Sequence, residues 1–238
     1  MLFLVLSLLP LSILASPLAP PTKYGVLLFT AFQALDVFGP LDVLNTLSFT
    51  EKNLTLSILS RELSPVSTLP LTMGTKFGQS VVTTHTLSSP PPDLEVLIVP
   101  GGAGTRAPDL SAEIEFIRNI YPSLRYLVSV CTGNALVARA GVLDGRKATG
   151  NKKAWSWVTQ QGNKTHWVAK ARWVVDGNIW STSGVSSAVD GTLNFVEKVY
   201  GEGIARDVEI GIEWTRIRDP SQDEFADIWG AKDVLPLE

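Results

Sequence analysis

The sequence has very little of the residues that build metal centres and disulfide frameworks. Its 238 residues include one cysteine and two histidines. One cysteine cannot form an intramolecular disulfide, so stability must come from a hydrophobic core, which 45% hydrophobic residues can supply. No Cys/His cluster has metal-ligand spacing, and we expect no metal and no other cofactor.

Blocks of positive charge are also absent. No run of Lys or Arg is longer than a pair, and the net charge is -3. Binding to nucleic acid needs a clustered basic surface that neutralises phosphates. The sequence therefore argues against nucleic acid as a partner and favours a small molecule.

The first fifteen residues, Met1–Ala15, are apolar and carry no charge. They are shorter than the roughly 20 apolar residues that span a bilayer, and Pro10 interrupts them. This pattern predicts a secretory signal peptide within residues 1–19, cleaved near Ala15 or Ala19, and a mature form without a membrane span. A retained anchor is the alternative, because the segment lacks the usual N-terminal Lys or Arg.

Two sequons for N-glycosylation follow the export segment, Asn53-Leu54-Thr55 and Asn163-Lys164-Thr165. Together with that segment they predict a secreted protein that is glycosylated at Asn53 and Asn163. No second apolar span and no linker follow, so we expect residues 20–238 to form a single domain.

Strand-like and helix-like segments alternate along this domain, which predicts an α/β fold with a mainly parallel sheet. The predicted strands are Tyr24–Phe29, Leu54–Leu59, Val96–Val99, Tyr126–Val130, and a hairpin of Arg172–Val175 and Asn178–Ser181. The predicted helices are Gly39–Leu47, Ser111–Tyr121, Thr132–Ala140, Ser186–Tyr200 and Gly203–Trp214. Residues 64–82 predict an irregular hairpin at the sheet edge. The tail from Asp219 is expected to pack on the domain through Phe225 and Trp229.

The single cysteine lies in the segment Ser129-Val130-Cys131-Thr132-Gly133, between a predicted strand and a predicted helix. Small residues two before and two after Cys131 are typical of a nucleophile elbow. The helix N-terminus favours a thiolate, and the N–H of Thr132 can hold developing negative charge. A buried apolar residue and an intermolecular disulfide are the other roles open to a lone cysteine.

A glycine-rich loop, Pro100-Gly101-Gly102-Ala103-Gly104, follows the strand expected beside the elbow. Glycines let the backbone approach a ligand closely, and Gly102 is our candidate for a second N–H donor to an anion. A simple chain turn is the alternative. The loop lacks the Lys-Ser/Thr pair of a phosphate-binding loop.

Several segments of the sequence together resemble a known protein superfamily. PGGAG at 100–104, SVCTGNALVARAGVLDGRKAT at 129–149 and SGVSSAVDGTLNFVE at 183–197 resemble the ThiJ/PfpI superfamily, from about Tyr24 to Gly201. With LDVFGPLDVL at 35–44, they look most like its isonitrile hydratase branch. The resemblance implies a flavodoxin-like three-layer sandwich, a homodimer, and a cysteine nucleophile partnered by an acid from the first loop.

That acid would be Asp36. An acid among apolar neighbours has a raised pKa and can hold a proton beside the sulfur. Capping a helix that starts near Gly39 is the alternative role for Asp36. Asp42 is expected at the surface or as a structural ligand of the loop. Asp190 is predicted to have a structural role.

One departure from the superfamily concerns histidine. Many relatives carry a histidine after the strand that follows the elbow, and Asn151 stands at that place here. His85 and His166 lie elsewhere and are predicted in loops, so a Cys-His dyad is poorly supported. Four tryptophans could line an aromatic pocket, although core packing is the simpler role for most of them: Trp155, Trp157, Trp167 and Trp173.

Taken with the elbow and Asp36, the resemblance implies a lyase that hydrates an isonitrile to an N-substituted formamide, with Cys131, Asp36 and Thr132 as catalytic residues and Gly102 and Thr132 as substrate-binding residues. One alternative is a glyoxalase- or deglycase-type enzyme that uses the same thiol. The other is a non-catalytic small-molecule binder or a redox sensor whose Cys131 oxidises to sulfinic acid.

Overall fold

The structure is a computed structural model that describes residues 19–70 and 72–237. The predicted signal peptide falls almost entirely on residues 1–18, which lie outside the described residues. Within the part of the chain that is described, no helix is long and apolar enough to cross a membrane.

A seven-stranded sheet forms the middle layer, in the order β10-β11-β7-β6-β1-β2-β5. Its strands are β1 (Lys23–Leu27), β2 (Thr55–Ser60), β5 (His85–Thr86), β6 (Val96–Val99), β7 (Tyr126–Val130), β10 (Trp173–Asp176) and β11 (Ile179–Thr182). All neighbours pair in parallel except β10, which is antiparallel to β11. The predicted parallel sheet and its terminal hairpin are confirmed.

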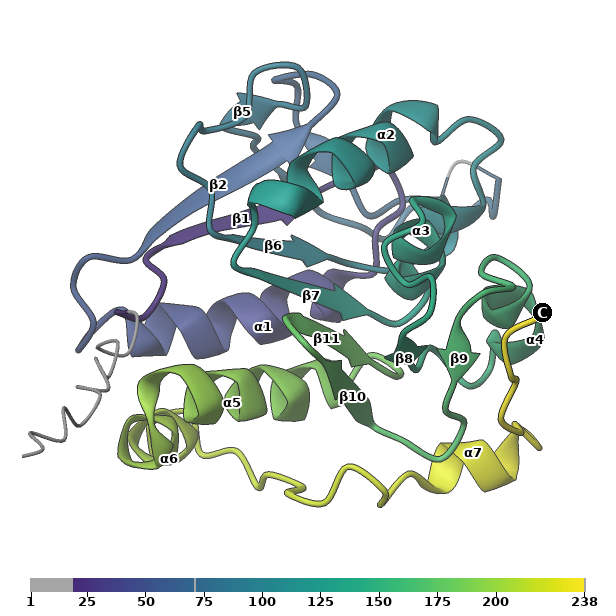
Figure 1. Ribbon diagram of the computed structural model, residues 1–238. Helices are drawn as coiled ribbons and strands as arrows, with labels where there is room; N and C mark the ends of the chain where they lie inside the picture. Colours follow the sequence, from purple (N-terminus) through teal and green to yellow (C-terminus); the bar gives the residue numbers. More distant parts are fainter. Residues whose placement is uncertain (1–18, 71, 238) are drawn as a thin grey trace, which may run out of the picture.

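Helices cover both faces of this sheet, as the flavodoxin-like prediction requires (Figure 1). One layer holds α1 (Ala34–Leu47), α5 (Ser187–Tyr200) and α6 (Glu202–Gly211), and the other holds α2 (Ser111–Ile120) and α3 (Gly133–Arg139). Because both faces are covered, the inner strands carry continuous apolar runs, and every residue of β6 is buried.

Smaller elements complete the chain. They are the paired strands β3 (Val66–Ser67) and β4 (Ser80–Val81), the paired strands β8 (Lys147–Ala148) and β9 (His166–Trp167), the 3-10 helices η1 (Ala103–Arg106) and η2 (Tyr121–Ser123), and the short helices α4 (Trp155–Thr159) and α7 (Glu224–Ile228). The predicted hairpin within 64–82 exists as β3 and β4, but it forms its own two-stranded sheet, and β5 occupies the edge of the main sheet. The two histidines lie in β5 and β9, so their placement in loops was wrong.

Helix α1 begins at Ala34, five residues before the predicted start at Gly39. Pro40 therefore lies inside the helix, although proline is ordinarily tolerated only in the first turn of a helix. Packing explains the difference: Val37, Gly39 and Pro40 are buried, and a Cβ on Gly39 would lie 3.0 Å from Val189 of α5. Tertiary contact therefore extends the helix through the proline.

The tail packs on the domain as predicted, but not through the residues we expected. Phe225 is 40% exposed and Trp229 is 51% exposed, whereas Asp223 and Ala226 are buried. The reason is that the anchor of the tail is a polar network, described below, and the two aromatic side chains face a cavity.

Candidate active site

The carboxyl ends of the parallel strands meet at one edge of the sheet, which is where α/β proteins of this kind bind ligands. Cys131 follows β7 directly, and the neighbouring strands β6 and β11 end beside it, as the pairs Val99–Ser129 and Thr182–Val130 show. The loops after β1, β6, β7 and β11 therefore surround the thiol.

Cys131 has the backbone conformation of a nucleophile elbow. Its φ is 60°, which is uncommon for a residue other than glycine, and its N–H donates to the carbonyl of Thr182 at 3.1 Å. Asn134 fixes the turn further, because its Nδ2 donates to the carbonyls of Cys131 at 3.0 Å and Thr182 at 2.8 Å. The predicted elbow is thus present and rigidly held.

The small residues on either side of the elbow have identifiable roles. A Cβ on Gly133 would lie 2.5 Å from the carbonyl oxygens of Val99 and Pro100, so only glycine lets α3 start this close to the loop after β6. Ser129 is fully buried, and its hydroxyl donates to Asn134.

Asp36 lies in the first turn of α1 and is fully buried. Its Oδ2 accepts the N–H of Gly101 at 2.9 Å, while its Oδ1 is buried and has no hydrogen-bond partner among the described residues. It makes no capping hydrogen bond, so the alternative role as an N-cap is wrong; Gln33 occupies that position. A buried carboxyl with a free oxygen is suited to hold or transfer a proton.

Thr132 and the glycine loop form a tight polar web over the elbow. The N–H of Gly102 donates to Thr132 Oγ1 at 2.9 Å, and Thr105 Oγ1 donates to the same oxygen at 3.1 Å. A Cβ on Gly101 would lie 2.6 Å from the Thr132 nitrogen, which explains the glycine there. The predicted role of Gly102 as a direct anion donor conflicts with this geometry, because its N–H is already used to orient the Thr132 hydroxyl.

Asn151, the residue at the place where the family resemblance implies a histidine, contacts the nucleophile. Its Nδ2 donates to Cys131 Sγ at 3.2 Å, and its Oδ1 accepts the N–H of Ala154 at 3.0 Å, which fixes the orientation of the amide. The sequence identified this position, but not the contact with sulfur. His85 lies in β5 at the far edge of the sheet and His166 in β9, and neither makes a hydrogen bond with Cys131.

Burial controls the protonation of the central pair. It raises the pKa of Asp36 from 3.8 to about 7, against the stabilising N–H of Gly101. It also raises the pKa of the Cys131 thiol well above its ordinary value, and the neighbouring Asp36 charge adds to this, although the Thr132 N–H and Asn151 act in the opposite direction. Burial therefore outweighs the predicted effect of the helix N-terminus, which favours the thiolate, in the resting protein.

A cavity of about 290 Å³ lies next to the pair. Three of its lining residues connect it with the site: Asn151 contacts the sulfur, Val185 packs against Cys131, and Leu35 precedes Asp36. Cys131 itself is 5% exposed. Neither Cys131 nor Asp36 lines the cavity, so a ligand there would have to pass the side chains of Asn151 and Val185 to reach the thiol.

The remaining predicted residues fall outside this centre. Asp42 is exposed on α1, and Asp190 is structural, because its carboxylate accepts from Arg172 at 2.6 Å and from the Trp214 indole at 2.8 Å. Trp155, Trp167 and Trp173 are core residues as expected, and the aromatic lining of the cavity comes from Phe225 and Trp229 instead. The two sequon asparagines, Asn53 and Asn163, lie in exposed turns; their glycosylation and the export of the chain stay predictions.

Comparisons with known proteins find relatives over most of the chain. The sequence model of the DJ-1/PfpI family matches residues 22–198. An isonitrile hydratase from Pseudomonas putida is 32% identical over 194 residues, covering 81% of this chain and 78% of the relative.

Solved structures show the same fold. A ThiJ/PfpI family protein from Pseudomonas syringae superposes with a TM-score of 0.69 at 23% identity, over 90% of this chain and 83% of that chain. DJ-1beta from Drosophila melanogaster superposes with a TM-score of 0.66 at 18% identity, over 82% of this chain and all 100% of that chain.

Proposed function

This chain belongs to the DJ-1/PfpI family, and from that premise we propose that it is a cysteine-dependent lyase that hydrates an isonitrile to an N-substituted formamide. The observation that carries the proposal is the buried pair of Cys131 and Asp36, in which a carboxyl with a pKa of about 7 lies beside a nucleophile elbow. The likeness to an isonitrile hydratase over most of the chain supports this reaction. The homodimer expected from the family resemblance stays a prediction.

The first step joins the isonitrile to the enzyme. Asp36 gives its proton to the terminal carbon of R–N≡C while Cys131 Sγ attacks that carbon, and the thiol proton passes to the Asp36 carboxylate. One C–H bond and one C–S bond form, one S–H bond breaks, and the product is a thioimidate, R–N=CH–S–Cys131. The proton held by Asp36 is essential, because the isonitrile carbon must be protonated as the sulfur attacks.

The second step releases the product. Water adds to the thioimidate carbon, its protons pass to the nitrogen and the departing sulfur, and the C–S bond breaks to give R–NH–CHO and the free thiol. Asn151 Nδ2, which donates to Sγ in the resting protein, stabilises the sulfur as it leaves with negative charge. The Thr132 N–H, which already favours the ionised form of Cys131, adds to this stabilisation, while the Thr132 hydroxyl is held in the web by Gly102 and Thr105.

The direct test is to incubate the purified protein with phenyl isonitrile and to measure N-phenylformamide by chromatography and mass spectrometry. We expect formamide to form in proportion to enzyme and time, and heat-denatured protein to form none above the uncatalysed rate. A parallel assay with methylglyoxal examines the glyoxalase- or deglycase-type alternative. Consumption of methylglyoxal without any formamide from the isonitrile would reject the proposed reaction in favour of that alternative.

The pH profile should report the protonation of Asp36. We expect kcat/KM to be highest below about pH 7 and to fall as pH rises through that value, because the ionised carboxyl has no proton to give and opposes ionisation of the thiol. Asp36→Asn should lower kcat/KM by about 100-fold and remove this step from the profile. The exposed Asp42→Asn variant on the same helix is the control and should keep both rate and profile.

The same pKa shift affects stability with a defined sign. The folded protein binds the Asp36 proton more tightly than the unfolded chain does, so the free energy of unfolding should fall as pH rises from about 4 to about 7. This part of the pH dependence should be missing in Asp36→Asn. If Asp36→Asn retained the wild-type activity profile, Asp36 would not be the acid of the reaction.

A further inference from the structure

The last part of the chain, residues 219–237, crosses the domain as a strap. It lies beyond residue 198, where the match to the family model ends. In Figure 1 it runs from below α5 and α6 through α7 and returns beside β9 and α4. Backbone pairing holds its end, because Val234 exchanges hydrogen bonds with Trp167 of β9 at 2.8 and 3.0 Å.

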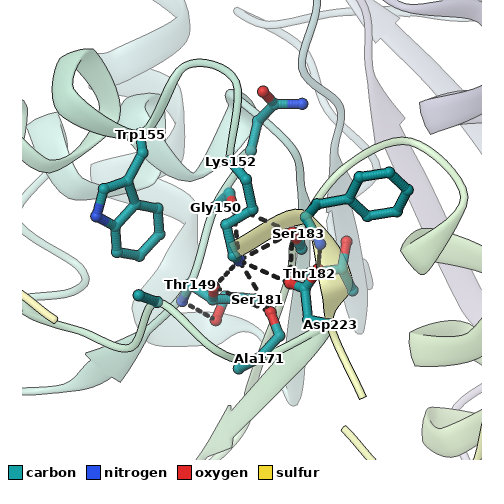
Figure 2. A network of polar contacts seen from close by, with 12 residues as sticks. Thr149, Gly150, Lys152, Trp155, Ala171, Ser181, Thr182, Ser183 and Asp223 are labelled. Carbon is teal, nitrogen blue, oxygen red and sulfur yellow. Dashed lines mark hydrogen bonds and ion pairs between the residues drawn. The ribbon is translucent and has the colours of Figure 1, made fainter. Parts of the chain in front are cut away.

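A buried ion pair fixes the middle of the strap to the wall of the active site. Lys152 Nζ lies 3.2 Å from Asp223 Oδ2, and the two side chains are 1% and 0% exposed. Figure 2 shows Lys152 surrounded by acceptors from several segments: Thr149 Oγ1 at 2.8 Å, Gly150 O at 3.1 Å, Ala171 O at 3.0 Å and Ser183 Oγ at 2.9 Å. Because Asn151 precedes Lys152, this network links the strap to the residue that contacts the nucleophile.

The strap supplies one wall of the cavity beside the thiol. Phe225 of α7 and Trp229, which follows α7 directly, line the cavity together with Leu35 and Val185 from the domain. The Asp223 carboxylate accepts the N–H of Phe225 at 3.1 Å, which joins the aromatic wall directly to the buried ion pair. Trp229 also lies 5.9 Å from Lys153 Nζ, within the range of a cation–π contact.

The size and lining of this cavity restrict the group that it can hold. At about 290 Å³ it is at the small end of ligand sites, which suits a single ring rather than a long or branched group. The residues described as lining it include the exposed cation Lys153, and Lys152, whose charge is paired with Asp223, but no carboxylate, so a cationic substituent would be disfavoured. Two partly exposed aromatic side chains offer flat apolar faces that a second ring can stack on.

We propose that the strap is the specificity element of this enzyme, and that Phe225 and Trp229 select isonitriles whose substituent is a flat aromatic ring. This inference rests on the proposed function for the identity of the reaction, but the selection itself acts on any reagent that approaches Cys131 through the cavity. It can therefore be tested without isonitrile turnover.

The test compares alkylation of Cys131 by N-phenyl iodoacetamide and N-methyl iodoacetamide, which share one reactive group. Each rate is divided by the rate with glutathione, and modification at Cys131 is followed by mass spectrometry. The wild type should prefer the phenyl reagent by about 10-fold, the usual size of one apolar contact in a binding pocket. Trp229→Ala should lose most of this preference, and Trp229→Phe should keep most of it.

Ile228→Ala is the matched control, because Ile228 is the exposed apolar residue at the end of α7, next to Trp229, and does not line the cavity. It should keep the wild-type preference. The inference is overturned if neither reagent labels Cys131, which would show that the cavity gives no access to the thiol, if the wild type has no preference, or if Trp229→Ala retains the preference. A wild type that prefers the phenyl reagent but makes no formamide from phenyl isonitrile refutes the proposed reaction and still supports selection by the strap.

Discussion

Replacing Cys131 by serine is expected to lower kcat/KM for formamide production by at least about 1000-fold. A serine hydroxyl is a much weaker nucleophile than a thiol, and its alkoxide is a poorer leaving group in the second step than a thiolate. Asp36, which accepts the thiol proton, has a pKa of about 7 and is too weak a base to activate the far less acidic serine hydroxyl, and Asn151 donates to the sulfur and supplies no base. The measurement is the initial rate of N-phenylformamide formation at several isonitrile concentrations.

Thermal unfolding of the serine variant should remain close to that of the wild type, because the elbow is held by Asn134 and by backbone contacts that do not involve the sulfur. Cys131→Ala is the second variant and should show the same loss, which excludes an effect of the new hydroxyl. Formamide production within about 10-fold of the wild type by a folded serine variant would show that Cys131 is not the nucleophile, and the reaction would need another group.

The local features of this site were predictable because short sequence patterns determine them. Small residues around Cys131 correctly predicted the elbow, since the close approach of α3 to the loop after β6 excludes a side chain at Gly133. The strands Val96–Val99 and Tyr126–Val130 have the predicted bounds, because runs of apolar residues covered on both faces end sharply at polar or glycine-rich turns. Asp36 was placed in the site by family resemblance.

The acidity of the thiol was not predictable from the same residues. It depends on burial, and the side chains that bury Cys131 include Ala188 and Val185, which are distant in the sequence. The helix N-terminus favours a thiolate, but removal of the sulfur from water outweighs it in the resting protein. We therefore expect ionisation of Cys131 to accompany substrate binding and proton transfer, rather than to precede them.

The strap was only partly predictable. Phe225 and Trp229 indicated that the tail packs on the domain, but aromatic residues alone could not show whether they enter the core or face a cavity. The buried partnership of Lys152 and Asp223 has no sequence signature, because the two residues are far apart and each is common on protein surfaces. Only the folded chain brings them together.

Removing either member of the buried Lys152–Asp223 pair should lower the free energy of unfolding far more than removing a member of an exposed ion pair. Lys152→Met leaves the Asp223 carboxylate buried without its cation, and Asp223→Leu leaves an ammonium beside neutral acceptors only. Each substitution should lower the free energy of unfolding by about 3–5 kcal/mol, the usual cost of an uncompensated buried charge. The measurement is urea unfolding at about pH 6, where Lys152 is charged although burial lowers its pKa to about 8.

The double variant Lys152→Met/Asp223→Leu separates the interaction energy of the ion pair from the individual effects of the two substitutions. It should be more stable than the sum of the single effects predicts, by an amount within the usual range of about 0.5–3 kcal/mol, because no unpaired charge remains. Lys170→Met is the matched control: its ion pair with Asp227 also joins the strap at 2.9 Å, but both side chains are largely exposed, so its loss should cost no more than about 1 kcal/mol. If Lys152→Met and Lys170→Met were equally mild, the buried pair would not be what fastens the strap. The hydrogen bonds that Pro220, Lys232, Asp233, Val234 and Leu237 make with the domain would then have to hold it.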